Sequence, residues 1–96
     1  MNNKVSELEA RFRHLGVVSG KTLLLPEAAA IEFIEALRGI DARVLGIDSF
    51  QIKSGGICPL PEHVLDLSSG CTDSWSEAAT FINQRREAGF HFEVVA

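Results

Sequence analysis

The chain has 96 residues, of which 46% are hydrophobic, and its formal net charge at pH 7 is −4. This length fits one small domain spanning residues 1–96, and the apolar content excludes an intrinsically disordered chain. No apolar run approaches the roughly 20 residues that a membrane helix needs, and the polar, acid-containing N-terminus excludes a secretory signal. We therefore expect a cytoplasmic protein that does not bind a membrane.

The charge is distributed unevenly along the chain. Residues 1–21 carry four basic and two acidic side chains, a net charge of +2, whereas residues 22–96 carry five basic and eleven acidic ones, a net charge of −6. Nucleic-acid binding needs a basic patch, so we expect no direct contact with nucleic acid. An acidic surface instead favours capture of a basic protein partner.

The sequence contains no recognisable catalytic, metal-binding or phosphate-binding motif. Cys58 and Cys71 are thirteen positions apart, outside any metal-binding spacing, and we expect two free, partly buried thiols unless neighbouring strand ends bring them together. The three histidines are scattered, and the serines and glycines form neither a nucleophile motif nor a phosphate-binding loop. The sequence therefore predicts no catalytic residue, metal ligand or cofactor, and no enzyme.

The N-terminal part predicts a helix that packs on the rest of the chain. Apolar residues recur at helical spacing over residues 4–15, and Gly16 is the expected stop. The apolar stripe is narrow and the helix short, so the helix needs a surface to dock on. Residues 17–20 are expected to be a connector, so that residues 1–20 form an N-terminal unit and residues 21–96 an α+β core.

The core begins with a short strand over residues 21–25. Pro26 is expected at the first position of a helix over residues 26–38, with Gly39 as its C-terminal stop. A strand follows over residues 42–52, because its apolar run is nearly continuous. The inward stripe of the helix consists of Ala30, Ile31, Phe33, Ile34 and Leu37.

The middle of the chain predicts a hairpin with an irregular second arm. A turn is expected at residues 53–56, where two glycines can adopt a positive φ. The returning segment is interrupted by Pro59 and Pro61, which cannot donate to a ladder, so it is an edge strand, a bulge or a loop. Residues 64–67 then resume as a strand.

The last third predicts a helix and a strand. Ser74 and Glu77 match a capping box for a helix over residues 75–88, with Asp73 as the rival N-cap. A strand with alternating apolar residues closes the chain over residues 90–95. After the N-terminal helix, the order is therefore β-α-β-β-α-β. We expect an α+β fold in which a small antiparallel or mixed four-stranded sheet carries two helices on one face, plus the N-terminal helix.

Acidic residues are the most suggestive functional signal. Asp48 and Asp66 each lie in an apolar, strand-like run, where a carboxylate needs a partner or water. The acid-rich segment over residues 41–77 fits either a solvated surface or a recognition surface for a basic protein. Paired carboxylates for acid–base catalysis rank third, because no base and nucleophile accompany them. Trp75, the only tryptophan, either staples its helix turn to the core or serves as an exposed interface anchor.

Several stretches resemble immunity proteins of bacterial toxin systems. The helix over residues 28–37, which contains Ala-Ile-Glu, and the strand over residues 44–48, which reads Val-Leu-Gly-Ile-Asp, are similar to the immunity protein of the colicin that cleaves tRNA anticodon loops. Ser49 stands where that pattern has glycine, and the N-terminal helix has no counterpart there. Residues 75–78 and 89–94 are similar to the last helix and strand of related polymorphic-toxin immunity proteins.

The resemblance implies an inhibitor that binds and neutralises a cognate bacterial toxin, a nuclease or a similar toxin, by occluding its basic substrate cleft with carboxylates in place of phosphates. The alternative class is a small-ligand-binding regulatory module that holds an amino acid or a nucleotide at a dimer edge. A homodimer through an exposed strand edge stays open. The interface residues that the resemblance implies are Asp48, Phe50, Glu62, Asp66, Asp73 and Trp75.

Overall fold

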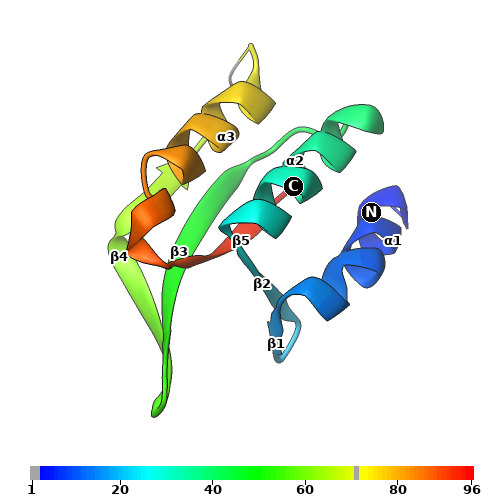
Figure 1. Cartoon of the computed structure of the whole chain (residues 1–96). Coiled ribbons are helices and arrows are strands. Elements are labelled where there is room, and N and C mark those ends of the chain that lie inside the picture. The colour runs from blue at the N-terminus through cyan, green and yellow to red at the C-terminus, as the bar shows by residue number, and fades with distance from the viewer. Residues whose placement is uncertain (1–2, 71) are drawn as a thin grey trace.

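The computed structural model describes residues 3–70 and 72–96 (Figure 1). Cys71 lies outside the described residues, and Cys58 is a free thiol that is exposed rather than partly buried. The elements in chain order are α1 (Asn3–Phe12), the 3-10 turn η1 (Arg13–Leu15), β1 (Val17–Ser19), β2 (Thr22–Pro26), α2 (Glu27–Gly39), β3 (Gly46–Lys53), β4 (Gly56–Asp66), α3 (Ser74–Asn83), the 3-10 turn η2 (Arg86–Ala88) and β5 (His91–Val95).

The described strands form one antiparallel sheet of five strands in the order β1-β2-β5-β3-β4. The α+β class is confirmed, but the predicted four-stranded sheet is wrong in detail. The expected connector over residues 17–20 contains the extra strand β1, which pairs with β2 from Val17 opposite Leu24 onwards. Gly20 has the left-handed φ of 62° that this two-residue turn requires.

The three helices lie side by side over one face of the sheet, with α2 in the middle (Figure 1). The predicted stripe of α2 is buried in the core, apart from the half-buried Ile31. The helix α1 docks through Leu8 and through Phe12, whose ring meets that of Phe33 edge-on at 5.2 Å between centroids. None of the described helices is long and apolar enough to cross a membrane. The core consists mainly of Leu8, Leu25, Phe33, Ile34, Leu37, Val44, Ile47, Ala78, Phe81, Ile82, Phe92 and Val94.

Both ends of α2 differ from the prediction by one or two residues. Pro26 is still part of β2, where it pairs with His91, and it caps the helix in an extended conformation. At the other end, the left-handed residue is Asp41, with a φ of 56°, and not Gly39. The backbone N–H groups of Asp41 and of the next residue donate to carbonyls of the last turn at 3.0 and 2.9 Å, which closes the helix.

The predicted strand over residues 42–52 begins late, as β3, because α3 holds the residues that precede it. The Ser74 hydroxyl accepts a hydrogen bond from the Val44 N–H at 3.0 Å. The indole Nε1 of Trp75 donates to the Ala42 carbonyl at 2.8 Å. These backbone groups are thus satisfied by side chains rather than by a neighbouring strand.

Asp73, and not Ser74, caps α3. The Asp73 carboxylate accepts hydrogen bonds from the Ser76 N–H at 3.0 Å and from the Ser76 hydroxyl at 2.8 Å. The expected capping box between Ser74 and Glu77 is therefore wrong, since the Ser74 side chain is buried against the segment before β3. The helix ends at Asn83, earlier than predicted, and the turn η2 follows it.

The strand β4 is an edge strand with a bulge, as predicted, but it is not broken. An edge tolerates Pro59 and Pro61, whose missing N–H groups would weaken a central strand. The register of β3 against β4 shifts between Asp48 and Ser49, so that residues 61–63 bulge out of the ladder. The β3–β4 hairpin extends beyond the helices, as the lower end of Figure 1 shows.

Replacing Ser74 by alanine is expected to lower the free energy of unfolding by about 1–3 kcal/mol, because it leaves the fully buried N–H of Val44 without a partner. Urea denaturation followed by the fluorescence of Trp75 measures this loss. Ser76→Ala is the matched control in the same helical turn. Its effect should be smaller, because Ser76 is exposed and water can replace its hydroxyl. Equal losses in the two variants would contradict the assignment.

Candidate functional site

One face of the sheet is left uncovered by the helices. Along β5, the buried residues Phe92 and Val94 alternate with residues that point away from the helices. The same alternation along β3 turns Asp48 and Phe50 away from the helices. The strand register places these outward residues side by side. We call this surface the open face, and it comprises Asp48, Phe50, Ile52, Pro59, Val64, His91, Glu93 and Val95.

The open face combines exposed apolar side chains with shallow grooves. The exposed fractions of Val64 and Val95 are 48% and 38%. Two grooves of ≈380 and ≈280 Å³ cross the surface and share Asp48 and Val64. The larger groove also reaches Asp66, and the smaller one reaches Phe50. Both are lined by strands and strand ends, and no helix residue of the described chain lines either of them.

Carboxylates of like charge meet on the open face. Asp48 and Glu93 are direct cross-strand partners, an arrangement that opposes folding when both are ionised. Burial raises the pKa of Glu93, and the charge of Asp48 and then that of Glu9 on α1 raise it further. Asp66 lines the larger groove together with Asp48. A cationic group placed between these carboxylates would relieve their repulsion.

Glu93 is expected to make stability fall as the pH rises. Its pKa in the folded protein lies above the ordinary value of 4.5, so the folded state holds the proton more tightly than the unfolded chain does. The cost of ionising Glu93 is absent below 4.5 and grows as the pH passes through the folded-state pKa.

The Glu93→Gln variant isolates this contribution. Urea denaturation of the two proteins from about pH 4 to about pH 8 gives the free energy of unfolding at each pH. The stability of the parent protein, relative to that of Glu93→Gln, should decline across this range. The other titrating groups are present in both proteins, so their contributions cancel in the difference between the two curves. A difference that does not change with pH would therefore contradict the prediction.

Asp66 and Asp73 each stabilise their own loop. The Ser68 hydroxyl and N–H donate to Asp66 at 2.6 and 2.9 Å and lower the pKa of Asp66. The N–H and then the hydroxyl of Ser76 lower the pKa of Asp73 in the same way. The stabilisation by each carboxylate is complete above the ordinary pKa of 3.8 and is lost as the pH falls through the lowered folded-state pKa.

The other interface residues expected from the sequence lie in different places. Glu62 is exposed in the bulge of β4. Trp75 packs half-buried against the core and holds the Ala42 carbonyl, so it staples α3 to the chain before β3. Asp73 and Trp75 both belong to the helix layer. Three of the six residues thus line the two grooves on the open face, namely Asp48, Phe50 and Asp66.

Sequence reasoning missed Glu93 and Val64 as members of this surface. Alternation over residues 90–95 predicts that Glu93 lies on the polar side of its strand. Its pairing with Asp48 is a long-range contact that no local pattern encodes. Val64 lies beside Asp48 only because the bulge of β4 sets the register.

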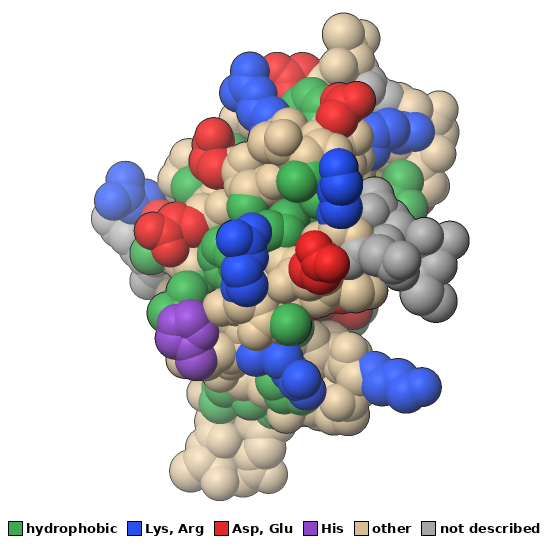
Figure 2. Space-filling view, turned by 90° about the vertical axis from the view of Figure 1, so that its right-hand side faces the viewer, with side chains coloured by type: hydrophobic (Ala, Val, Ile, Leu, Met, Phe, Trp, Pro, Cys, Tyr) green, Lys and Arg blue, Asp and Glu red, His purple; other side chains and the backbone are tan. Residues whose placement is uncertain are grey.

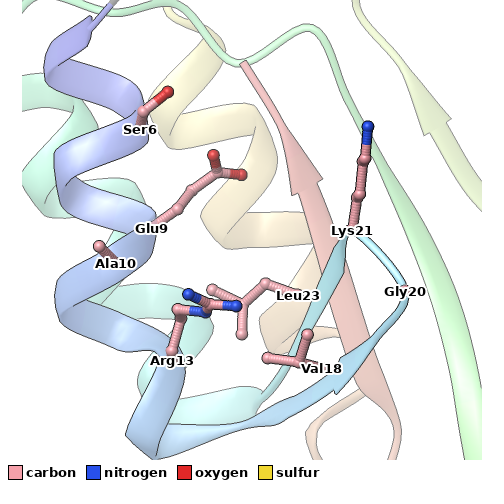
Figure 3. Close-up of a pocket in the computed structure, with 8 residues that line it drawn as sticks. All are labelled: Ser6, Glu9, Ala10, Arg13, Val18, Gly20, Lys21 and Leu23. Carbon is pink, nitrogen blue, oxygen red and sulfur yellow. The ribbon is translucent and has the colours of Figure 1, made fainter.

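A separate groove lies between α1 and the β1–β2 hairpin (Figure 3). It measures ≈280 Å³. In Figure 3 the guanidinium of Arg13 points from α1 towards Leu23 of the hairpin, and the carboxylate of Glu9 extends from α1 one turn above it. Lys21 rises from the hairpin on the opposite side of the groove. Basic and acidic side chains are mixed over this side of the molecule (Figure 2). The lining residues are Ser6, Glu9, Ala10, Arg13, Val18, Gly20, Lys21 and Leu23.

Both surfaces offer recognition by charge and apolar contact. Among residues 3–70 and 72–96, no group of three or more His, Cys, Asp or Glu side chains is arranged to hold a metal ion. In the described part of the chain, the carboxylates of the open face form no ion pair within 4.0 Å and lie beside apolar side chains, an arrangement that suits a basic ligand. Comparison with known proteins gave no match to a protein-family model, to a curated protein or to a solved structure.

Proposed function

We propose that this protein is an inhibitor of the immunity type, which neutralises a bacterial nuclease toxin by placing its open face over the toxin's basic substrate cleft. The observation that carries the proposal is the cross-strand pair of Asp48 and Glu93, set among uncovered apolar side chains. Lysine and arginine groups of the toxin would pair with these carboxylates, which take the place of substrate phosphates.

The energetics of the free protein support this proposal. The repulsion between Asp48 and Glu93 lowers the stability of the unbound protein, and a cationic partner removes that cost on binding. Phe50 and Val64 supply apolar contacts of the kind found at the centre of interfaces. The net charge of −6 over residues 22–96 favours fast capture of a basic domain.

The test is co-purification of this chain with a candidate nuclease toxin domain from its own host, taken first from the gene directly upstream. We expect a 1:1 complex that weakens as the ionic strength rises and that blocks the toxin's activity. Asp48→Lys reverses one charge on the open face and should abolish capture. The matched control is Glu35→Lys, which makes the same change at an exposed position of α2 in the helix layer and should leave capture intact.

Two results would overturn the proposal. One is the absence of any complex between the two folded proteins at low salt. The other is a complex that survives Asp48→Lys but is lost in Glu35→Lys, since the helix layer would then bind the toxin.

A further inference from the structure

We infer that the groove between α1 and the β1–β2 hairpin binds a free amino acid with an apolar side chain. This inference goes beyond the proposed function and does not depend on it, because the groove shares no described lining residue with the two grooves of the open face. The two surfaces are linked through the charge of Glu9, which raises the pKa of Glu93.

The charged groups of the groove are arranged for a ligand that carries both charges. Glu9 and Arg13 are four positions apart on one helix, a spacing at which they commonly pair with each other. Within the described residues, however, neither they nor Lys21 form an ion pair within 4.0 Å. Both side chains of α1 point into the groove instead (Figure 3).

Each end of an α-amino acid finds a complementary group here. The guanidinium of Arg13 offers two parallel donors to a carboxylate, and Lys21, which lines the groove from the hairpin, adds a second positive charge to this side of it. The carboxylate of Glu9 is left to accept the ligand's ammonium group. Among the described residues Glu9 forms no ion pair within 4.0 Å, and its charge raises the pKa of Glu93.

The apolar floor and the size of the groove indicate which side chain the bound amino acid would carry. Val18 and Leu23 are cross-strand partners that both line the groove, and Val18 is 42% exposed in the free protein. An aliphatic side chain would cover them. The groove volume of ≈280 Å³ lies just under the lower limit of about 300 Å³ for pockets that bind drug-sized ligands. A small ligand such as an amino acid therefore fits better than a nucleotide.

Titration of the ¹⁵N-labelled chain with L-leucine, followed by ¹H–¹⁵N correlation spectra, tests the inference without any protein partner. We expect saturable shifts of amides in α1 and in the β1–β2 hairpin. Two analogues act as ligand controls: 4-methylpentanoate lacks the ammonium group, and 3-methylbutylamine lacks the carboxylate. Each should bind about tenfold more weakly than leucine or worse.

Variants of α1 separate the groove from general charge effects. Arg13→Gln and Glu9→Gln should each weaken leucine binding about tenfold or more. The matched controls Arg11→Gln and Glu7→Gln change the same charges on the same helix outside the groove and should leave binding unchanged. The inference is overturned by the absence of saturable shifts, by equal binding of 4-methylpentanoate, or by equal losses in the control variants.

Discussion

Asp48→Asn is expected to weaken binding of the proposed partner, a basic toxin domain, by about 2 kcal/mol or more, about thirtyfold in Kd, while raising the free energy of unfolding. The two effects have one cause. The Asp48 carboxylate faces Glu93 across the strands, so its charge opposes folding of the free protein. In the proposed complex the same charge would attract the cations of the toxin domain. Asparagine has the same shape without the charge.

Isothermal titration calorimetry with the toxin domain and urea denaturation of the free protein measure the two quantities on the same preparations. Glu35→Gln removes one charge from the exposed side of α2 and should change both values by no more than about 0.5 kcal/mol. A variant at Asp48 that lost stability but kept its affinity would show that this carboxylate serves the fold and not a partner.

Local patterns predicted the parts of the fold that depend on local contacts. The helical spacing of Phe33, Ile34 and Leu37 identified the buried stripe of α2, because every fourth or third side chain shares one helix face. Pro59 and Pro61 restrict their segment to an edge strand, a bulge or a loop, since a missing N–H is a property of the residue itself, and β4 is an edge strand with a bulge. The turn expected at residues 53–56 is local as well, although only Gly56 and not Gly55 has a positive φ.

The errors arose where a distant contact decides the local structure. Ser74 fits the capping pattern in the sequence. In the structure, however, its hydroxyl accepts a hydrogen bond from the N–H of Val44, thirty positions away, and Asp73 caps the helix instead. The sequence predicts a connector where β1 lies, because these three residues form a strand only through their pairing with β2.

In the candidate site too, residues marked by a local pattern could be predicted and those placed by distant contacts could not. Asp48 could be predicted because a carboxylate in an apolar strand stands out in any sequence. Its partner Glu93 could not, because β5 comes last in the chain yet lies between β2 and β3 in the sheet. The groove beside α1 depends on how one helix docks against a hairpin, and the charges of Arg13 and Lys21 give no sign of this in the sequence.

Phe33→Ala is expected to cost about 3–5 kcal/mol of stability, the largest loss of any substitution considered for this chain. Phe33 is 2% exposed, lies in the middle of α2 and packs edge-on against Phe12 of α1. Removing its ring leaves a cavity at the point where α1 docks on the core. A domain of this size has a free energy of unfolding of about 5–15 kcal/mol, so a large share of the native stability would be lost.

Urea denaturation of Phe33→Ala measures this loss, and Glu35→Ala, two positions along the same helix on its exposed face, is the control with an expected change within about 0.5 kcal/mol. Phe12→Ala removes the other ring of the pair and should cost less, because Phe12 is only half-buried. If the ring contact holds α1 in place, the double variant should lose less than the sum of the two single losses, since each change removes the same contact. A loss below about 1 kcal/mol in Phe33→Ala would mean that the ring contact does not hold α1 on the core. The groove between α1 and the hairpin would then lack a fixed position for α1.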